Sequence, residues 1–324
     1  MATQRALITL DFVHPGDEVD RRLEEAGIQT VYNGWHGGRT EEEMIALLQG
    51  VDAVLADIDP FTARILASAD RLKVISRPGV GYDAIDVKAA SARGIAVCTT
   101  PGSNRHSVAE LTLAMILQCA RKIMENEAEV RRGGWARVVG NEIAGSILGI
   151  VGLGTIGKEV AQRAKAFEMR LLAYDLVQDQ QFAEEHQVTY VPLEQLLRES
   201  DYISLHILLD QRTRHLVNAE RIAMMKPSAY LINTARGPIV DEEALIQALK
   251  ESRIAGAALD VFTQEPLPMD SPLRGLDNVY LYPHLAGSTQ EVFKASGWMA
   301  AQNVVRVLRG ERPLHIVNPE VLQK

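Results

Sequence analysis

Cysteine is scarce in this 324-residue chain, where only Cys98 and Cys119 occur. Two cysteines so far apart make neither a disulfide framework nor a metal-binding spacing. We interpret both as small buried residues of a protein from a reducing compartment, and we expect no metal site.

A long apolar run is missing at the N-terminus. The first apolar stretch, residues 6–10, ends at the charged Asp11. Such a stretch is too short for a signal peptide or a membrane span. We therefore expect a soluble, cytoplasmic protein with no membrane partner.

Positive charge is in deficit, since the chain has 34 basic and 42 acidic residues and a formal net charge of −8. This surface repels phosphate backbones, and no dense run of Lys or Arg offsets it, so nucleic acid is not an expected partner. The content of 47% apolar and 23% charged residues is typical of a globular protein. The length predicts two domains.

Strand-like and helix-like segments alternate along the first hundred residues, without any internal repeat. Amphipathic stretches separate short apolar runs at residues 6–10, 29–32, 53–56, 73–76 and 95–98. This alternation is typical of an α/β domain with a parallel sheet.

The alternation stops at residues 104–131, which keep a helical pattern throughout. A continuous helix of this length would extend for roughly 40 Å. Pro101-Gly102 precedes it and Gly133-Gly134 follows it, which marks the boundaries of the segment. We expect the chain to cross into its second domain here.

A second alternating series follows, and its strand candidates are more apolar than those of the first. They are residues 147–151, 171–174, 202–205, 229–232, 254–259 and 279–282, and a last helix is expected at 291–308. Continuous apolar runs predict strands that are covered by helices on both faces.

A glycine-rich turn, Gly152-Leu153-Gly154-Thr155-Ile156-Gly157, joins the expected strand 147–151 to a helical stretch. In a dinucleotide site, Gly152 would allow the tight turn, Gly154 the approach of a pyrophosphate, and Gly157 close packing of helix and strand. The helix N-terminus would add unpaired N–H groups. The plainer alternative is a tight strand–helix turn without a ligand.

Asp175 ends the next expected strand, 18 residues past Gly157. This is close to the spacing of the acid that binds the adenosine ribose in dinucleotide sites. A carboxylate here repels a 2′-phosphate, so the pattern favours NAD over NADP.

Three candidates for chemistry follow the later strands. Arg236 can bind a carboxylate through two parallel N–H bonds, and His284 can exchange a proton near neutral pH. Glu265, if bonded to the other ring nitrogen of His284, would favour the imidazolium. His206 also ends a strand, and spacing alone does not choose between the two histidines.

With these residues the chain resembles the D-isomer-specific 2-hydroxyacid dehydrogenase family, in its phosphoglycerate-dehydrogenase-like branch. The resemblance covers nearly the whole chain. It is carried by residues 76–83, 107–111, 152–157, 233–237, 258–262 with Glu265-Pro266, and Pro283-His284.

The resemblance implies an NAD-dependent enzyme in which Arg236 binds the substrate carboxylate, His284 is the acid/base and Glu265 pairs with it. His206 then becomes a cofactor-side residue. The implied cofactor contacts are Gly152, Gly154, Thr155, Ile156, Gly157, Asp175, His206, Thr234 and Asp260, and the implied substrate contacts are Arg77, Gly79, Val80 and Gly81.

The resemblance also implies two doubly wound parallel-sheet domains. A Rossmann cofactor domain, residues 101–289, is inserted in a flavodoxin-like substrate domain of residues 1–100 and 290–324. It further implies a homodimer through residues 104–131, with Trp135 near the subunit contact.

The substrate is expected to be a small, non-phosphorylated 2-oxo acid such as glyoxylate or hydroxypyruvate. Phosphoglycerate dehydrogenases commonly have an arginine near the end of the third strand, whereas this chain has Asp57 and Asp59 there. Arg77 could supply a cation instead, so 3-phosphoglycerate is the runner-up. Pro78 removes one backbone donor beside the carboxylate site. An NAD-sensing corepressor is the alternative from a different functional class.

Overall fold

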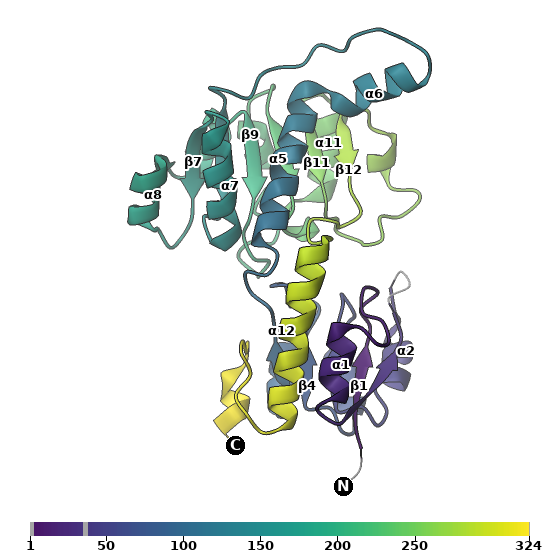
Figure 1. Ribbon diagram of the computed structural model, residues 1–324. Helices are drawn as coiled ribbons and strands as arrows, with labels where there is room; N and C mark the ends of the chain where they lie inside the picture. The colour runs from purple at the N-terminus through teal and green to yellow at the C-terminus, as the bar shows by residue number, and fades with distance from the viewer. Residues whose placement is uncertain (1–2, 35–37, 324) are drawn as a thin grey trace. The chain divides into compact units, whose positions relative to one another are not determined.

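The computed structural model describes residues 3–34 and 38–323 of the chain. The chain divides into two compact units, Met1–Asn104 with Gly287–Lys324, and Arg105–Ala286 (Figure 1). The expected roles, substrate binding by the first unit and cofactor binding by the second, are proposals. No helix among the described residues is long and apolar enough to cross a membrane.

The first unit contains a parallel sheet with the strand order β2-β1-β3-β4-β5. Two of its inner strands, β3 and β4, are buried along their whole length, as expected for strands covered on both faces. The strands are β1 (Gln4–Ile8), β2 (Ile28–Tyr32), β3 (Ala53–Leu55), β4 (Val74–Ser76) and β5 (Ala96–Cys98).

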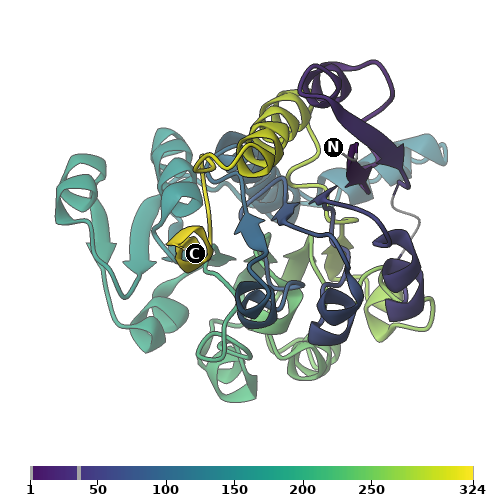
Figure 2. The ribbon, with the colours of Figure 1, turned by 90° about the horizontal axis from the view of Figure 1, so that it is seen from below.

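Helices cover both faces of this sheet. The core on one face includes residues of α1 (Glu18–Glu24) and α12 (Gln290–Leu308), which lie side by side in Figure 2. The opposite core includes residues of α2 (Glu41–Leu47), α3 (Ala63–Ser68) and α4 (Val87–Ala92). The helix α12, near the C-terminus, therefore covers one face of the sheet that the N-terminal residues form.

The second unit contains a parallel sheet with the order β12-β11-β10-β9-β6-β7-β8. The order reverses between β9 and β6, which is where ligands bind in doubly wound folds, beyond the carboxyl ends of the strands. The strands are β6 (Ile147–Val151), β7 (Arg170–Tyr174), β8 (Val188–Tyr190), β9 (Tyr202–Leu205), β10 (Tyr230–Asn233), β11 (Gly256–Leu259) and β12 (Val279–Leu281).

This sheet is also covered on both faces. One core includes residues of α5 (Arg105–Arg121), α7 (Thr155–Ala166) and α8 (Gln180–His186). The other includes residues of α9 (Leu193–Glu199), α10 (Ala219–Met224) and α11 (Glu242–Lys250). The expected architecture, two doubly wound parallel sheets, is confirmed.

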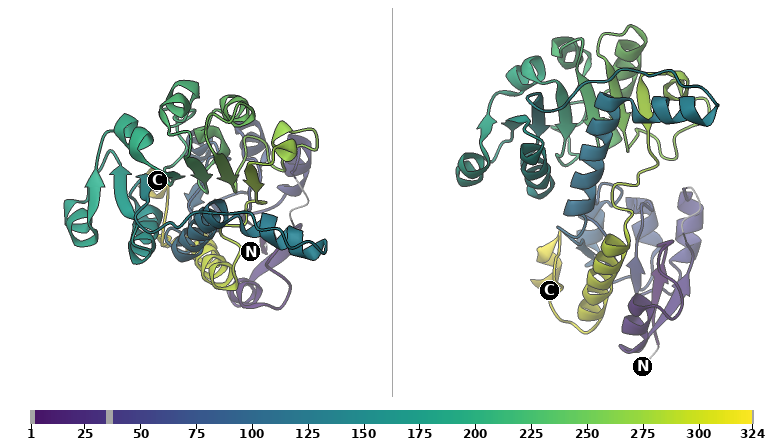
Figure 3. Two further views of the ribbon diagram at one scale, coloured as in Figure 1. Left: turned by 90° about the horizontal axis from the view of Figure 1, so that it is seen from above. Right: turned by 45° about the horizontal axis from the view of Figure 1, so that its top comes forward.

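The expected continuous helix over residues 104–131 is wrong in one respect. The helix breaks at Lys122, whose backbone is left-handed with φ 53°, and α6 (Ile123–Arg131) continues in another direction (Figure 3, right). The Lys122 ammonium lies 2.9 Å from the Tyr230 hydroxyl and 5.2 Å from the centre of that ring. These contacts come from a distant strand, so helical periodicity does not predict the break.

Candidate active site

The glycine turn after β6 has two glycines that the packing of the protein requires. Gly152 has φ 96°, and a Cβ there would lie 2.7 Å from the carbonyl oxygen of His206. A Cβ on Gly157 would lie 2.1 Å from the carbonyl oxygen of Gly152. Both positions therefore exclude any side chain.

Gly154 differs, because a Cβ there would meet no protein atom within 4 Å. Gly154 is also the N-cap of α7, and no side chain caps that helix. Thr155 and Ile156 form the first turn, whose N–H groups and partial positive charge suit a phosphate. The turn therefore fits a dinucleotide pyrophosphate.

Asp175 follows β7 and connects the glycine turn to the next loop. Its Oδ2 accepts the Leu153 N–H at 2.7 Å, and its Oδ1 accepts the Val177 N–H at 3.0 Å. Each carboxylate oxygen can accept more than one hydrogen bond, so ribose hydroxyls can still bind. A negative group fixed in this way fits an unphosphorylated ribose.

Arg236, Glu265 and His284 follow three neighbouring parallel strands, β10, β11 and β12. Nδ1 of His284 lies 2.6 Å from Oε2 of Glu265. The other carboxylate oxygen of Glu265 accepts the Phe262 N–H at 2.9 Å. Both oxygens of Glu265 are thus fixed, and one of them faces the imidazole.

The pKa of Glu265 reflects two opposing effects. Burial raises it, but the hydrogen bond with His284 and the charges of His284 and Arg236 outweigh burial, so the pKa is lowered from 4.5. The carboxylate is therefore ionised at neutral pH and only accepts hydrogen bonds. Nδ1 of His284 must carry the proton in this pair, which leaves Nε2 for a reacting group.

Asp260 holds the backbone of the histidine loop. Its buried carboxylate accepts the N–H groups of Leu285 at 2.8 Å and Ala286 at 2.9 Å. Its carbonyl oxygen accepts the His284 N–H at 2.9 Å, where the His284 backbone is left-handed with φ 54°. Burial raises the pKa of Asp260. Direct contact of Asp260 with a cofactor stays a prediction.

His206, the competing histidine, has a different environment. Its Nε2 lies 2.7 Å from the Ser204 hydroxyl, and burial lowers the pKa of His206 to about 3. The ring is therefore neutral near pH 7 and is a poor proton donor, which favours His284 as the acid. Thr234, another expected cofactor contact, is buried with its hydroxyl 3.2 Å from that of Thr112.

The expected substrate contacts lie in the first unit, after β4. The buried Arg77 donates to the carbonyl oxygens of Asp57 and Gly81. The Gly79 N–H donates to the Thr100 hydroxyl at 2.5 Å. Arg77 therefore braces the loop that contains Val80 and Gly81. Substrate binding by Arg77 and by residues 79–81 stays a prediction.

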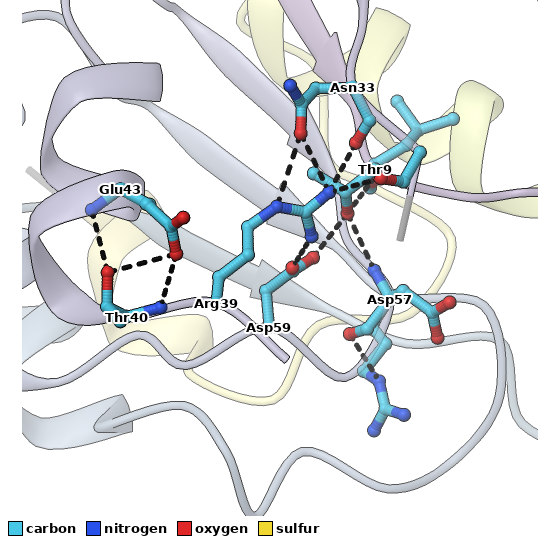
Figure 4. Close-up of polar contacts among 10 residues, drawn as sticks. Thr9, Asn33, Arg39, Thr40, Glu43, Asp57 and Asp59 are labelled. Carbon is cyan, nitrogen blue, oxygen red and sulfur yellow. Dashed lines mark hydrogen bonds and ion pairs between the residues drawn. The ribbon is translucent and has the colours of Figure 1, made fainter. Parts of the chain in front are cut away.

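The carboxylates of the two acids after β3 have different surroundings (Figure 4). Asp59 is fully buried, forms an ion pair with Arg39 and accepts a hydrogen bond from Thr9. The Asp57 carboxylate points away from that cluster, and burial raises its pKa despite the charge of Arg77. Arg39 therefore neutralises the carboxylate of Asp59 but not that of Asp57.

Sequence reasoning missed two contacts of the candidate residues and their loops, one in each unit. Lys158 of α7 forms an ion pair with Asp179 in the loop after Asp175. Thr100, after β5, accepts the Gly79 N–H. Asp179 directly precedes a helix and is typical of an N-cap, so only its position four residues after Asp175 could have drawn attention to it.

Known proteins are similar to this chain over most of its length. Residues 113–286 match the NAD-binding domain of the D-isomer-specific 2-hydroxyacid dehydrogenases. A glyoxylate reductase from Korarchaeum cryptofilum is 40% identical over 94% of this chain and 96% of its own length. A D-3-phosphoglycerate dehydrogenase from Methanocaldococcus jannaschii is 41% identical over 98% of this chain, which spans 60% of that protein.

A solved structure, the D-lactate dehydrogenase of Aquifex aeolicus with NAD and lactic acid, has the same fold. The TM-score is 0.85 at 30% identity, over 97% of this chain and 99% of that one. Both the sequence and the fold of this chain are therefore similar to those of such enzymes over almost its full length. The protein belongs to the D-isomer-specific 2-hydroxyacid dehydrogenase family and is an NAD-dependent oxidoreductase.

Proposed function

We propose that this enzyme reduces a small, non-phosphorylated 2-oxo acid to its 2-hydroxy acid, either glyoxylate to glycolate or hydroxypyruvate to D-glycerate. The contact that carries the proposal is the 2.6 Å pair of Glu265 and His284, which follow the adjacent strands β11 and β12. Arg236 follows β10, the next strand of the sheet after β11. An acid/base beside a carboxylate-binding cation is what the reduction of a 2-oxo acid requires.

In this mechanism, Arg236 holds the substrate carboxylate through two parallel hydrogen bonds. Protonated His284 donates its Nε2 proton to the oxygen on C2, while Glu265 stabilises the imidazolium. The bound nicotinamide cofactor supplies the hydride that C2 receives. In the oxidative direction, neutral His284 accepts the hydroxyl proton.

The cofactor site in this proposal is the turn from Gly152 to Gly157, with Gly154, Thr155 and Ile156 at the pyrophosphate. Asp175 binds the adenosine ribose. His206, Thr234 and Asp260 line the cofactor side of the site. The open space beside Gly154 and the uncapped N-terminus of α7 support this assignment.

The charge after β3 supports a substrate without phosphate. A dianion near Asp57 would face a carboxylate, while Arg77 already donates to two backbone carbonyls. The 40% identity with a glyoxylate reductase supports the same choice. The 41% identity with a D-3-phosphoglycerate dehydrogenase makes 3-phosphoglycerate the second candidate.

The test is turnover of purified protein with NADH and glyoxylate, hydroxypyruvate, phosphohydroxypyruvate or pyruvate. We expect the highest kcat/KM with glyoxylate or hydroxypyruvate. A clear preference for phosphohydroxypyruvate would establish the phosphoglycerate alternative. Binding of NADH without turnover of any 2-oxo acid would instead favour the corepressor alternative.

We further propose a homodimer and a cytoplasmic location. Large apolar side chains are exposed along and after α6, with Trp135 78% exposed, and a concentration of exposed apolar residues marks interfaces. The others are Ile123, Met124, Val130, Val138 and Val139. Cys98 and Cys119 are both free and buried, which suits a reducing compartment.

A further inference from the structure

An ion pair lies next to the loop that follows Asp175. Lys158 belongs to α7, one residue after the last glycine of the turn, and its ammonium lies 2.5 Å from Oδ2 of Asp179. The same ammonium lies 5.1 Å from the centre of the Phe182 ring. The pair therefore connects the glycine-turn helix to the start of α8.

Hydrogen bonds fix Asp179 in this orientation. Its Oδ1 accepts the Phe182 N–H at 3.0 Å, which caps α8, and its own N–H donates to the Tyr190 hydroxyl at 3.0 Å. The hydrogen bond from Lys158 lowers the pKa of Asp179, so this carboxylate is ionised at neutral pH. Oδ2 remains directed at Lys158.

The stability of the fold does not explain this pair. The side chain of Lys158 is 32% exposed and that of Asp179 is 44% exposed, and ion pairs exposed to this degree stabilise a fold only slightly. A role in the local electrostatics of the adjacent cofactor loop accounts for it better.

The charges in this loop matter for the choice of cofactor. The loop reads Asp175-Leu176-Val177-Gln178-Asp179 and contains no cation. A ribose 2′-phosphate carries a charge of about −1.5 to −2 and is normally bound by Arg or Lys. Lys158 reaches this loop, and Asp179 neutralises it.

We propose that Asp179 is a second determinant of NAD over NADP, acting as a positioning residue through Lys158. Asp179 directs the Lys158 ammonium away from a 2′-phosphate and cancels its charge, so the negative charge of Asp175 is not offset. The inference rests on the proposed role of Asp175 at the adenosine ribose.

The test measures the dissociation constants of NADH and NADPH with the full-length protein by fluorescence titration, without substrate. Asp179→Asn keeps an oxygen that can cap α8 but removes the charge. We expect the ratio of the NADPH to the NADH constant to fall by about fivefold, the size of one exposed ion pair. Adding Lys158→Met should restore the original ratio.

Two controls separate this proposal from its alternatives. Lys165→Met, also on α7, removes a lysine that bonds to a backbone carbonyl, and it should leave the effect of Asp179→Asn intact. Equal weakening of both cofactors by Asp179→Asn would mean that the pair only holds the loop, which overturns the inference. A shifted ratio that persists with Lys158→Met would exclude action through Lys158.

Asp175→Ala distinguishes failure of the inference from failure of the cofactor site. If Asp175→Ala weakens the preference for NADH and Asp179→Asn does not, only the present inference is wrong. If neither substitution changes the ratio of the NADPH to the NADH dissociation constant, another group distinguishes the two riboses. The proposed cofactor site is then wrong as well.

Discussion

Single residues set the protonation states on which the proposed chemistry depends. Glu265 is held by the Phe262 N–H on one oxygen and by His284 on the other. Because its pKa is lowered below 4.5, the charge of Glu265 and its stabilising effect persist at neutral pH. Both are lost only when the pH falls through that lowered pKa.

Glu265→Gln tests this interaction. Glutamine keeps the size of the side chain but removes the negative charge that favours the protonated ring. The pH above which reduction slows should therefore move to lower values by about one pH unit. The measurement is kcat/KM against pH in the reductive direction. An unchanged profile would show that the charge of Glu265 does not act on His284.

At the scale of elements, the turn from β6 into α7 contains one glycine that protein packing requires and one beside which the protein leaves open space. A Cβ on Gly157 would collide with the backbone of Gly152, whereas a Cβ on Gly154 would meet no protein atom within 4 Å. Packing therefore requires glycine at Gly157, whereas at Gly154 only the proposed pyrophosphate would require it.

Gly154→Ala and Gly157→Ala form a matched pair that tests this distinction. Gly154→Ala should leave the free energy of unfolding nearly unchanged and weaken NADH binding at least about tenfold, since the methyl group occupies the space near the pyrophosphate. Gly157→Ala should destabilise the fold by about 1–3 kcal/mol through overpacking. Urea unfolding and NADH titration give both quantities, and the reverse pattern would refute the assignment.

The same scale shows the limits of sequence patterns. Strands 147–151 and 202–205 are predicted with their observed bounds because all of their residues except the partly buried Ile147 are buried. β8 is missed, since this three-residue edge strand has only Val188 buried. The break at Lys122 is missed because it depends on tyrosines more than a hundred residues away.

For the whole molecule, alternating strands and helices predict two doubly wound sheets, and both occur. The order of motifs along the chain also brings Glu265 and His284 to neighbouring strand ends, as expected. Periodicity could not reveal that Arg39 neutralises Asp59 or that Asp179 holds Lys158. Such pairs depend on the three-dimensional path of loops, which sequence patterns do not encode.

The proposal that His284 is the acid/base has its most direct test in turnover of the His284→Gln variant with NADH and hydroxypyruvate. His206→Gln serves as the matched control. We predict that His284→Gln lowers kcat at least about a hundredfold, the contribution of a general acid, while NADH still binds. His206→Gln should lower kcat much less, because the His206 ring is neutral near pH 7 and does not donate the proton. Near-normal turnover by His284→Gln would contradict the account and return His206 to consideration.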